Sequence, residues 1–462
     1  MLMSKVFFTW DEIVSATGGH WLVEPKGEGV MTVEDDSRKV ACGALFVAIV
    51  GETADGHAYV QKAAEAGAAA VCVQRRPEES VMSKLAALSC GCLLVDDGMA
   101  AFQALANAHR RRFPKIPVIA VTGSCGKTSS KEMCAAVLEA HWPGSVIKTT
   151  GNTNNFFGVP RNLFRINEGT AAAVIEAGSN HPGEIATLAA MIEPTGALIT
   201  CIGAAHLEFF HDLNGVAEEK GDIFQALPEG SPAVMPADCD GKEILLRHAS
   251  GRKVITFGLG DNADVQAIYG GLTEQGYALG IVRKDTGERV DFHWNIGGEC
   301  QAGNAAAACA LGISLGISLS ECAKGLQHCS LPGARMNETD VGGVHWANDA
   351  YNANPSSMAA SLQWFREASA KASSRYVLLG DMLELGESTE SMHRMVLEKA
   401  LALFPNDTVV TIGPRFAPFA EKHGLTHFRN IDEARTLAFP QGAWVFLKGS
   451  LGMGLYKLVP EG

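Results

Sequence analysis

The sequence lacks a long hydrophobic run. It contains no uninterrupted stretch of about 18 apolar residues, the length that a membrane-spanning helix requires. Its N-terminus reads MLMSKVFFTWDE and turns acidic before the apolar core of a signal peptide develops. We therefore predict a cytoplasmic protein without membrane insertion.

An excess of positive charge and paired cysteines are also missing. The formal net charge is −13, which argues against general binding to nucleic acid or to an anionic membrane. The 12 cysteines include no C-x-x-C pair, and Cys90 and Cys92 stand too close together for a usual zinc pair. We therefore expect reduced, buried thiols, as in a cytosolic enzyme.

Apolar residues make up 47% of the chain and charged residues 19%, a globular composition. A chain of 462 residues is too long for one ordinary core, so several domains are expected. Strand-like apolar runs alternate with helical stretches, which predicts an α/β fold. Boundaries in the basic segment RRRFPKIP and near Leu331-Pro332-Gly333 give domains 1–114, 115–331 and 332–462. The expected strands include 44–50, 69–73, 93–95, 171–177, 197–202, 233–235, 376–379, 408–412 and 444–447, and the expected helices include 58–66, 99–112 and 303–314.

Residues 121–130 read VTGSCGKTSS, between an apolar strand and a helix-like stretch. This order predicts a nucleotide phosphate site, because loop N–H groups and a helix N-terminus face an anion together. Gly123 and Gly126 allow the backbone to approach phosphate, Lys127 would reach the outer phosphates, and Thr128 would bind Mg²⁺. The common pattern has four residues between its first glycine and Gly-Lys, whereas this loop has two. A glycine turn without a ligand is the alternative.

Polar residues follow two of the expected strands of the middle domain. Glu176 ends the strand AAAVIE, and His206 follows the strand ALITCI. If both strands flank the loop strand, these side chains converge near Thr128 and could hold Mg²⁺. A carboxylate can also end a strand by chance. Lys220 lies on an expected helix beside acidic residues, and the pattern alone favours a solvated lysine.

The third domain carries a dense polar segment, HWANDAYNANPSS, at 345–357. Asp349 could accept hydrogen bonds from a ribose or an ammonium group, although Asn and Pro could also simply turn the chain. Arg335 could reach a phosphate. Lys448 ends the strand WVFLK. Both cations could equally be surface charges.

These segments together resemble the Mur ligases, ATP-dependent amide-forming enzymes of peptidoglycan synthesis, and most closely those that join D-alanyl-D-alanine to UDP-N-acetylmuramoyl-tripeptide. The family uses the short Gly-x-x-Gly-Lys-Thr loop. The resemblance implies a three-domain fold with a central P-loop ATPase-like parallel sheet and a C-terminal Rossmann-like domain. It is carried by DSRKVACGALFVAIVGETADGHAY, VTGSCGKTSSKEM, GNTNNFFGVP, EAGSNHPGEI, AAHLEFF, KGDIF, NDAYNANP, LLGDMLELGE and LKGS, which occur in this order along the chain.

The resemblance also assigns residues. It implies Lys127, Glu176, His206 and Lys220 as catalytic residues, and Thr128, Glu176, His206 and a carbamylated Lys220 as Mg²⁺ ligands. The implied ATP contacts are Gly123, Ser124, Cys125, Gly126, Lys127, Thr128, Ser129, Asn304, Arg335 and Asp349. The implied substrate contacts are Asp36, Ser37, Arg38, Asn152, Asn155, Asn180, His181, Tyr351, Asn352, Asn354 and Lys448.

One segment departs from the family. The Mur ligases usually show G-x-H-N-x-x-N before the alanine-rich helix, whereas this chain has GECQAGN at 298–304. Cys300 and Gln301 stand in the His-Asn positions, which puts the adenine-side contact in doubt, although Gln301 still offers an amide.

The implied reaction phosphorylates the tripeptide carboxylate with ATP and then joins it to the dipeptide amine. A monomer is expected. The third residue of the tripeptide, meso-diaminopimelate or lysine, stays open. The alternatives are a sister ligase that adds that third residue, a folate polyglutamylating ligase and a P-loop nucleotide switch. The first would carry an Asp-Asn-Pro-Arg signature in its diaminopimelate form, which this sequence lacks. The second would lack the DSR and DGH segments.

Overall fold

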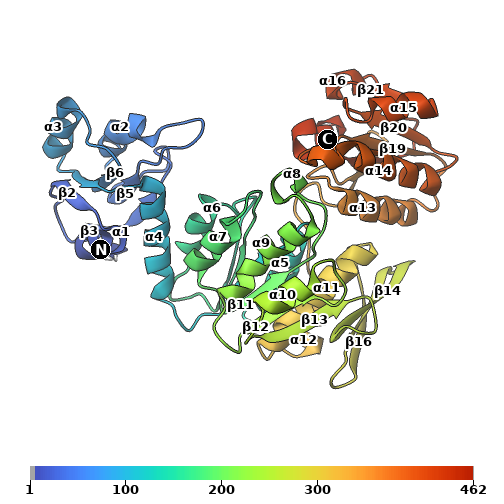
Figure 1. Ribbon diagram of the computed structural model, residues 1–462, viewed down its shortest axis with the longest axis horizontal. Coiled ribbons are helices and arrows are strands. Elements are labelled where there is room, and N and C mark those ends of the chain that lie inside the picture. Colours follow the sequence, from blue (N-terminus) through green and yellow to red (C-terminus); the bar gives the residue numbers. More distant parts are fainter. Residues whose placement is uncertain (1–5, 461–462) are drawn as a thin grey trace. The chain divides into compact units, whose positions relative to one another are not determined.

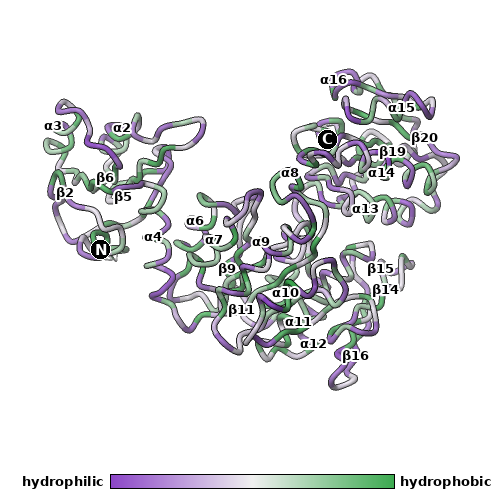
Figure 2. The backbone as a smooth tube through the Cα atoms, viewed as in Figure 1, coloured by the Kyte–Doolittle hydropathy of each residue, from purple (hydrophilic) through white to green (hydrophobic). Residues whose placement is uncertain are grey.

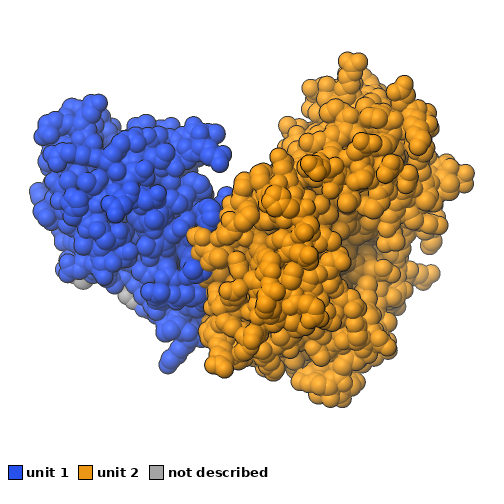
Figure 3. All heavy atoms as spheres, viewed as in Figure 1, with its two compact units in different colours: residues 1–116, 149–170, 190–193 blue, residues 117–148, 171–189, 194–462 orange. Residues whose placement is uncertain are grey.

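A computed structural model describes residues 6–460, so the first five residues of the expected first domain lie outside it. The chain forms two compact units (Figure 3). Of the described residues, the first unit contains 6–116, 149–170 and 190–193, and the second contains 117–148, 171–189 and 194–460. Each unit is described by itself.

The first unit is built on a sheet with strand order β2-β7-β6-β5-β4. Strands β4 to β7 are parallel, and β2 pairs antiparallel with β7. The apolar runs at β5 and β6 are fully buried, as expected for parallel strands covered by helices. The strands are β1 (Phe8–Thr9), β2 (His20–Val23), β3 (Gly29–Val30), β4 (Thr32–Glu34), β5 (Ala44–Val47), β6 (Ala70–Val73) and β7 (Gly91–Leu94). The helices are α1 (Trp10–Thr17), η1 (Gly56–Tyr59), α2 (Val60–Glu65), α3 (Glu79–Ala87), α4 (Gly98–Arg111) and α6 (Gly158–Leu163).

The larger sheet of the second unit has the order β16-β15-β14-β13-β12-β11-β8-β10-β9. Figure 1 labels its strands β11, β12, β13, β14 and β16. It is parallel from β9 to β14, and β15 and β16 continue it as antiparallel strands. The strands are β8 (Val118–Thr122), β9 (Val146–Lys148), β10 (Ala172–Glu176), β11 (Gly196–Ile199), β12 (Pro232–Pro236), β13 (Lys253–Gly258), β14 (Val265–Thr273), β15 (Gly276–Arg283) and β16 (Glu288–Trp294). The helices are α5 (Lys127–His141), α7 (Glu184–Ile192), α8 (Leu207–Phe210), α9 (Leu213–Gln225), α10 (Lys242–His248), α11 (Glu299–Ser314) and α12 (Leu319–Gln327). The last residues of α7, 190–192, belong to the first unit.

A second sheet in this unit has the order β17-β18-β22-β19-β20-β21. It is parallel except for the β17–β18 hairpin. The strands are β17 (Asn337–Val341), β18 (Val344–Asn348), β19 (Arg375–Gly380), β20 (Thr408–Ile412), β21 (Thr426–Phe428) and β22 (Trp444–Lys448). The helices are α13 (Pro355–Ala368), η2 (Gly386–Ser388), α14 (Thr389–Leu403), α15 (Ala417–His423), α16 (Ile431–Ala434), η3 (Leu451–Met453) and η4 (Leu455–Leu458). The predicted α/β fold and the main predicted strands are confirmed, with shifts of a few residues at strand ends.

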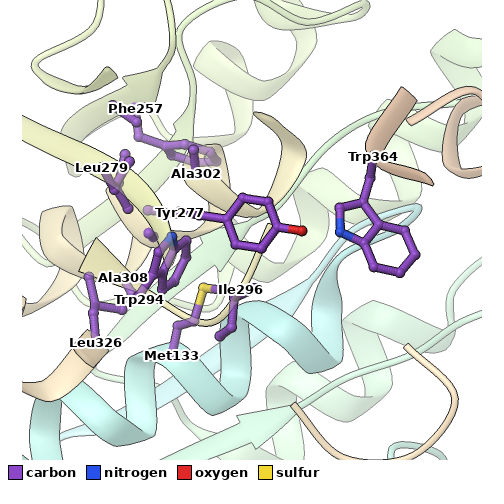
Figure 4. Packing of buried hydrophobic residues seen from close by; sticks show 14 of the residues in the cluster. Met133, Phe257, Tyr277, Leu279, Trp294, Ile296, Ala302, Ala308, Leu326 and Trp364 are labelled. Carbon is purple, nitrogen blue, oxygen red and sulfur yellow. The ribbon is translucent and has the colours of Figure 1, made fainter. Parts of the chain in front are cut away.

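One core joins helices and strands of the second unit. Met133 of α5, Leu279 of β15 and Leu326 of α12 belong to the same buried cluster, and the Tyr277 hydroxyl points toward Trp364 of α13 (Figure 4). Truncating a fully buried leucine such as Leu279 to alanine costs about 2–5 kcal/mol. The core therefore holds the layer that carries α13 against the larger sheet.

Hydrophobic and hydrophilic residues alternate along the chain in short stretches (Figure 2). Within residues 6–460, no helix has the length and apolar character that crossing a membrane requires.

Candidate active site

The loop between β8 and α5 has the conformation that its glycines allow. Gly123 and Gly126 have φ values of 144° and 76°, which residues other than glycine rarely adopt. A Cβ atom on Gly123 would lie 2.0 Å from the Thr200 hydroxyl, and one on Gly126 would lie 2.9 Å from the Asn304 amide oxygen. Lys127 begins α5, and its Nζ donates to the Gly123 carbonyl at 2.7 Å. The loop thus encloses a helix N-terminus and a lysine in the arrangement that binds anions.

The end of β10 lies beside this loop. Strand β10 runs parallel to β8, and Glu176, its last residue, pairs in register with Val121. Glu176 is buried, and its Oε1 accepts a hydrogen bond from the Thr128 hydroxyl at 3.2 Å. A hydroxyl and a carboxylate are the oxygen ligands that Mg²⁺ prefers, together with phosphate oxygens. The structure therefore brings two of the predicted metal ligands together.

Lys220 points into the protein from α9. It is 1% exposed, and its Nζ donates to the Ser179 hydroxyl at 2.5 Å and to the Ser179 carbonyl at 3.2 Å. The Phe210 ring lies 5.3 Å from Nζ. Burial, and next the positive charge of Lys127, lower the pKa of Lys220 to about 7. The interpretation of Lys220 as a solvated lysine is wrong, because it lies on the buried face of α9 while Glu218 lies on the exposed face.

His206 lies in a left-handed turn before α8, with φ 53°. Its Nδ1 lies 2.6 Å from Oε2 of Glu384, whose backbone is also left-handed. Burial lowers the pKa of His206, the Glu384 charge opposes this, and the charges of Lys127 and Lys220 lower it further. His206 therefore shares one electrostatic environment with both lysines. A cavity of about 140 Å³ adjoins it, lined by residues 204–206, 352–354, 383–385 and 450–452.

Asp349 and Lys448 meet at the ends of the parallel strands β18 and β22. Lys448 Nζ donates to Asp349 Oδ2 at 2.5 Å and to the Asn352 carbonyl at 3.0 Å. Asp349 also accepts from the Ser361 hydroxyl at 2.5 Å and from the Met336 N–H at 3.1 Å. The interpretation of Lys448 as a surface charge is wrong, because it is 2% exposed.

The polar segment after β18 also shapes the backbone. Asn354 caps α13, accepting from the Ser357 N–H at 2.8 Å, so part of the segment has the turn role considered above. Arg335 donates to the Thr128 hydroxyl at 3.3 Å, and its guanidinium lies 3.8 Å from the centre of the Tyr351 ring. Arg335 thus reaches the phosphate loop from the segment that leads into β17.

Three segments match families described as "Mur ligase family, catalytic domain" (30–110), "Mur ligase middle domain" (121–312) and "Mur ligase, glutamate ligase domain" (334–451). The UDP-N-acetylmuramoyl-tripeptide–D-alanyl-D-alanine ligase of Bacillus subtilis is 34% identical to this chain over 448 residues, which cover 93% of this chain and 92% of the relative. This chain belongs to the Mur ligase family.

Two further comparisons find proteins that are also described as ligases of this kind. The ligase of that name in Escherichia coli is 35% identical, over 92% of each chain. A crystal structure of MurF from Acinetobacter baumannii superposes with a TM-score of 0.87 at 29% identity, covering 98% of this chain and 97% of that one. The likeness thus extends through both compact units.

The segment in which this Mur ligase departs from the family pattern adjoins the phosphate loop. Asn304 of α11 lies beside Gly126, and its side-chain amide donates to Oε1 of the Gln301 side chain at 3.0 Å. Gln301 in turn donates to the Ser129 hydroxyl at 3.5 Å, a long contact, while Cys300 is exposed. The Gln301 amide therefore links α11 to the first turn of α5.

The predicted substrate residues of the first unit form local pairs. Arg38 donates to both Asp36 carboxylate oxygens, at 2.9 and 2.8 Å, and these bonds hold the pKa of Asp36 well below its usual range. The Arg38 side chain is 81% exposed. Asn155 accepts from the Gly158 N–H at 3.0 Å and so fixes the start of α6. Ser37 is half-buried and Asn152 is exposed.

In the second unit, Asn180 and His181 both direct their backbone N–H groups to Glu184, at 2.8 and 3.1 Å. The His181 ring lies 4.1 Å from the Phe209 ring, so this loop packs against α8.

The sequence analysis did not single out Ser179 or Glu384 as site residues. Both stand in segments that carry the family resemblance, but their contacts with Lys220 and His206 span 41 and 178 residues of sequence. Among residues 6–460, no three His, Cys, Asp or Glu side chains come together as a ready metal site. A metal here would therefore depend on Thr128, Glu176, the free ring nitrogen of His206 and oxygens supplied by a ligand or a modified side chain.

Proposed function

We propose that this Mur ligase joins D-alanyl-D-alanine to UDP-N-acetylmuramoyl-tripeptide with ATP, through an acyl phosphate. The observation that carries the proposal is the convergence of the phosphate loop, Glu176 and Lys220 in a chain whose relatives of this name align over more than nine tenths of its length. The three family matches also support domains 1–114, 115–331 and 332–462.

The loop residues supply the first half of the chemistry. Lys127 and the N–H groups that begin α5 would hold the outer phosphates of ATP and stabilise the charge on the transferred phosphoryl group. Thr128 and Glu176 fit Mg²⁺, which would add positive charge there when bound. Arg335, which donates to the Thr128 hydroxyl, would add a second positive charge near the phosphates.

His206 fits a metal-ligand role through its second nitrogen. A ligating histidine usually presents its other ring nitrogen to a carboxylate, which fixes the ring orientation. The contact between Nδ1 and Glu384 has this form and leaves Nε2 as the ligand atom. Glu384 would thus position His206.

Lys220 is suited to carbamylation. Its uncharged amine would attack CO₂, form an N–C bond and release a proton, which turns a cation into a carboxylate-like group. The reaction needs the neutral amine, and the pKa of about 7 supplies it near neutral pH. The Ser179 hydroxyl would then donate to the new oxygens. A ¹³C signal from a carbamate, formed with labelled bicarbonate and missing in Lys220→Ala, would test this assignment.

The remaining assignments concern the substrates. Exposed Arg38, held by Asp36, would meet the UDP-sugar in the first unit. The cavity beside His206, lined by Asn352 and Asn354, has room for a small acceptor. We also propose a cytoplasmic monomer, which sedimentation would test.

The deciding experiment measures phosphate release from ATP with UDP-N-acetylmuramoyl-tripeptide, with and without D-alanyl-D-alanine, while mass spectrometry follows the pentapeptide. We expect both signals to require the dipeptide. Release that ignores the dipeptide would contradict the proposal and favour a sister ligase or a nucleotide switch.

A further inference from the structure

Two cysteines face each other across the phosphate loop. Cys125 is the loop residue before Gly126, and Cys201 follows the end of β11. Their Sγ atoms lie 3.0 Å apart, and the Cys125 N–H donates to Cys201 Sγ at 3.3 Å. The backbones are joined as well, because the Ser124 N–H donates to the Cys201 carbonyl at 3.0 Å. The two thiols are therefore held together by the fold.

Accessibility and ionisation suit this pair to oxidation. Both cysteines are partly exposed, whereas Cys72, Cys134 and several others are buried. The hydrogen bond from Cys125 lowers the pKa of Cys201 to about 7, against the effect of burial, and the Cys125 N–H and Lys127 lower it further. The same hydrogen bond raises the pKa of Cys125. A thiolate beside a neutral thiol is the arrangement found in redox-sensing cysteine pairs.

We propose that Cys125 and Cys201 form a reversible disulfide under peroxide, which disables the phosphate loop. The Cys201 thiolate attacks one peroxide oxygen, the O–O bond breaks, and hydroxide departs. Cys201 then carries a sulfenic acid. Cys125 then gives its proton to hydroxide, attacks that sulfur and forms the S–S bond as the second hydroxide leaves and takes up a proton. Two thiols are oxidised to one disulfide, and one peroxide is reduced to two waters.

The loop has little freedom to accommodate this bond. A disulfide needs its sulfurs about 2.05 Å apart, so they must approach each other by roughly 1 Å. The neighbouring Gly123 already lies against Thr200, whose hydroxyl also donates to the Cys125 carbonyl at 2.5 Å. We therefore expect the bond to displace the Cys125 backbone, whose N–H and carbonyl are both engaged, and with it the neighbouring N–H groups of the loop. The effect on nucleotide rests on the proposed ATP site, whereas the formation of the disulfide does not.

The test treats the reduced full-length protein with hydrogen peroxide and measures three quantities. Peptide mass mapping without reductant should find Cys125 joined to Cys201. Binding of a fluorescent ATP analogue and ligase activity should fall by about 10²-fold, the scale of a 1 Å misplacement. Dithiothreitol should restore both.

Two variants sharpen the test, each compared with its own activity before oxidation. Cys201→Ala should keep its activity under the same dose, whereas Cys42→Ser, an exposed cysteine of the first unit, should be inactivated like the native chain. Mapping in the native chain decides the chemistry even if Cys201→Ala fails to fold. The proposal fails if Cys125 pairs with another cysteine such as Cys300, if Cys201→Ala is inactivated equally, or if the disulfide forms and nucleotide binds as before.

Discussion

Two lysines of the second unit are buried almost equally, but within residues 6–460 one forms an ion pair with a carboxylate and the other does not. Lys448 is 2% exposed and lies 2.5 Å from an Asp349 oxygen. Lys220 is 1% exposed, and its Nζ contacts the hydroxyl and carbonyl of Ser179 and the ring of Phe210. The lysine without an ion-pair partner is the one whose pKa is lowered, first by burial and next by the charge of Lys127.

The carboxylate next to Lys220 in sequence is used elsewhere. Glu219 accepts from the N–H groups of Gly183 and Ile185, at 2.6 and 2.8 Å, where α7 begins. Its charge therefore stabilises a helix N-terminus. Lys220 keeps its neighbour Lys127 as a repelling cation, which adds to the effect of burial on its pKa.

The largest effect on activity that tests this comparison is expected for Lys220→Met. Removing the proposed carbamate should cost about 3 kcal/mol of transition-state stabilisation, or about 10²-fold in activity. The free energy of unfolding should stay the same or rise, because methionine needs no desolvation of a charge. Ligase assays and urea unfolding measure the two. Short carboxylates such as acetate should restore part of the activity of Lys220→Ala, and full activity in either unaided variant would contradict the carbamate assignment.

The matched change, Lys448→Met, should act first on stability. It leaves the Asp349 carboxylate buried without its cation, which should lower the free energy of unfolding by about 3–5 kcal/mol. Adding Asp349→Asn removes that charge and should recover part of the loss. Urea unfolding of the two single variants and the double variant gives the coupling between the residues. Equal stability of Lys448→Met and the native chain would show that the ion pair does not hold this edge of the sheet.

The pH dependence of stability should separate the two lysines further. The pKa of Lys220 is lowered from 10.5 to about 7 in the folded state, so between these values the unfolded chain binds more protons than the folded chain. In buffer freed of CO₂, the free energy of unfolding should therefore rise as the pH rises from about 7 to 10.5. This gain in stability from Lys220 is lost again as the pH falls toward 7. Lys220→Met should lack this rise in stability with pH. Urea unfolding of both proteins at about pH 7.5 and about pH 9.5 measures the rise. An equal change in the free energy of unfolding for the two proteins would argue against the lowered pKa of Lys220.

Local patterns predicted the parts of the site that are local in space. The buried run of β8, the glycine loop and the start of α5 are consecutive, so their order alone indicated a phosphate site. Glu176 could be placed because parallel strands end at a common edge.

The partners of the lysines could not be predicted in this way. Lys220 and Ser179 are 41 residues apart, and Lys448 and Asp349 are 99 residues apart. The acidic neighbours of Lys220 suggested a solvated helix face, because sequence alone does not show which side of α9 the sheet covers. Contacts across such separations depend on strand order and register, which composition and periodicity do not encode.

Arg335 offers a third case, a half-buried cation that stacks on an aromatic ring. Its guanidinium lies 3.8 Å from the centre of the Tyr351 ring while it donates to the Thr128 hydroxyl. Arg335→Lys keeps the charge but loses the planar stack, which is worth about 0.5–1 kcal/mol at a partly exposed site. The KM for ATP should therefore rise by roughly two- to fivefold, with kcat and the free energy of unfolding nearly unchanged.

Tyr351→Leu should raise the KM for ATP by a similar factor. The double variant with Arg335→Lys should show no further rise, because both changes remove the same contact. Additive effects of the two substitutions would mean that Arg335 reaches the nucleotide without the help of Tyr351, and its position would then depend on the Thr128 contact.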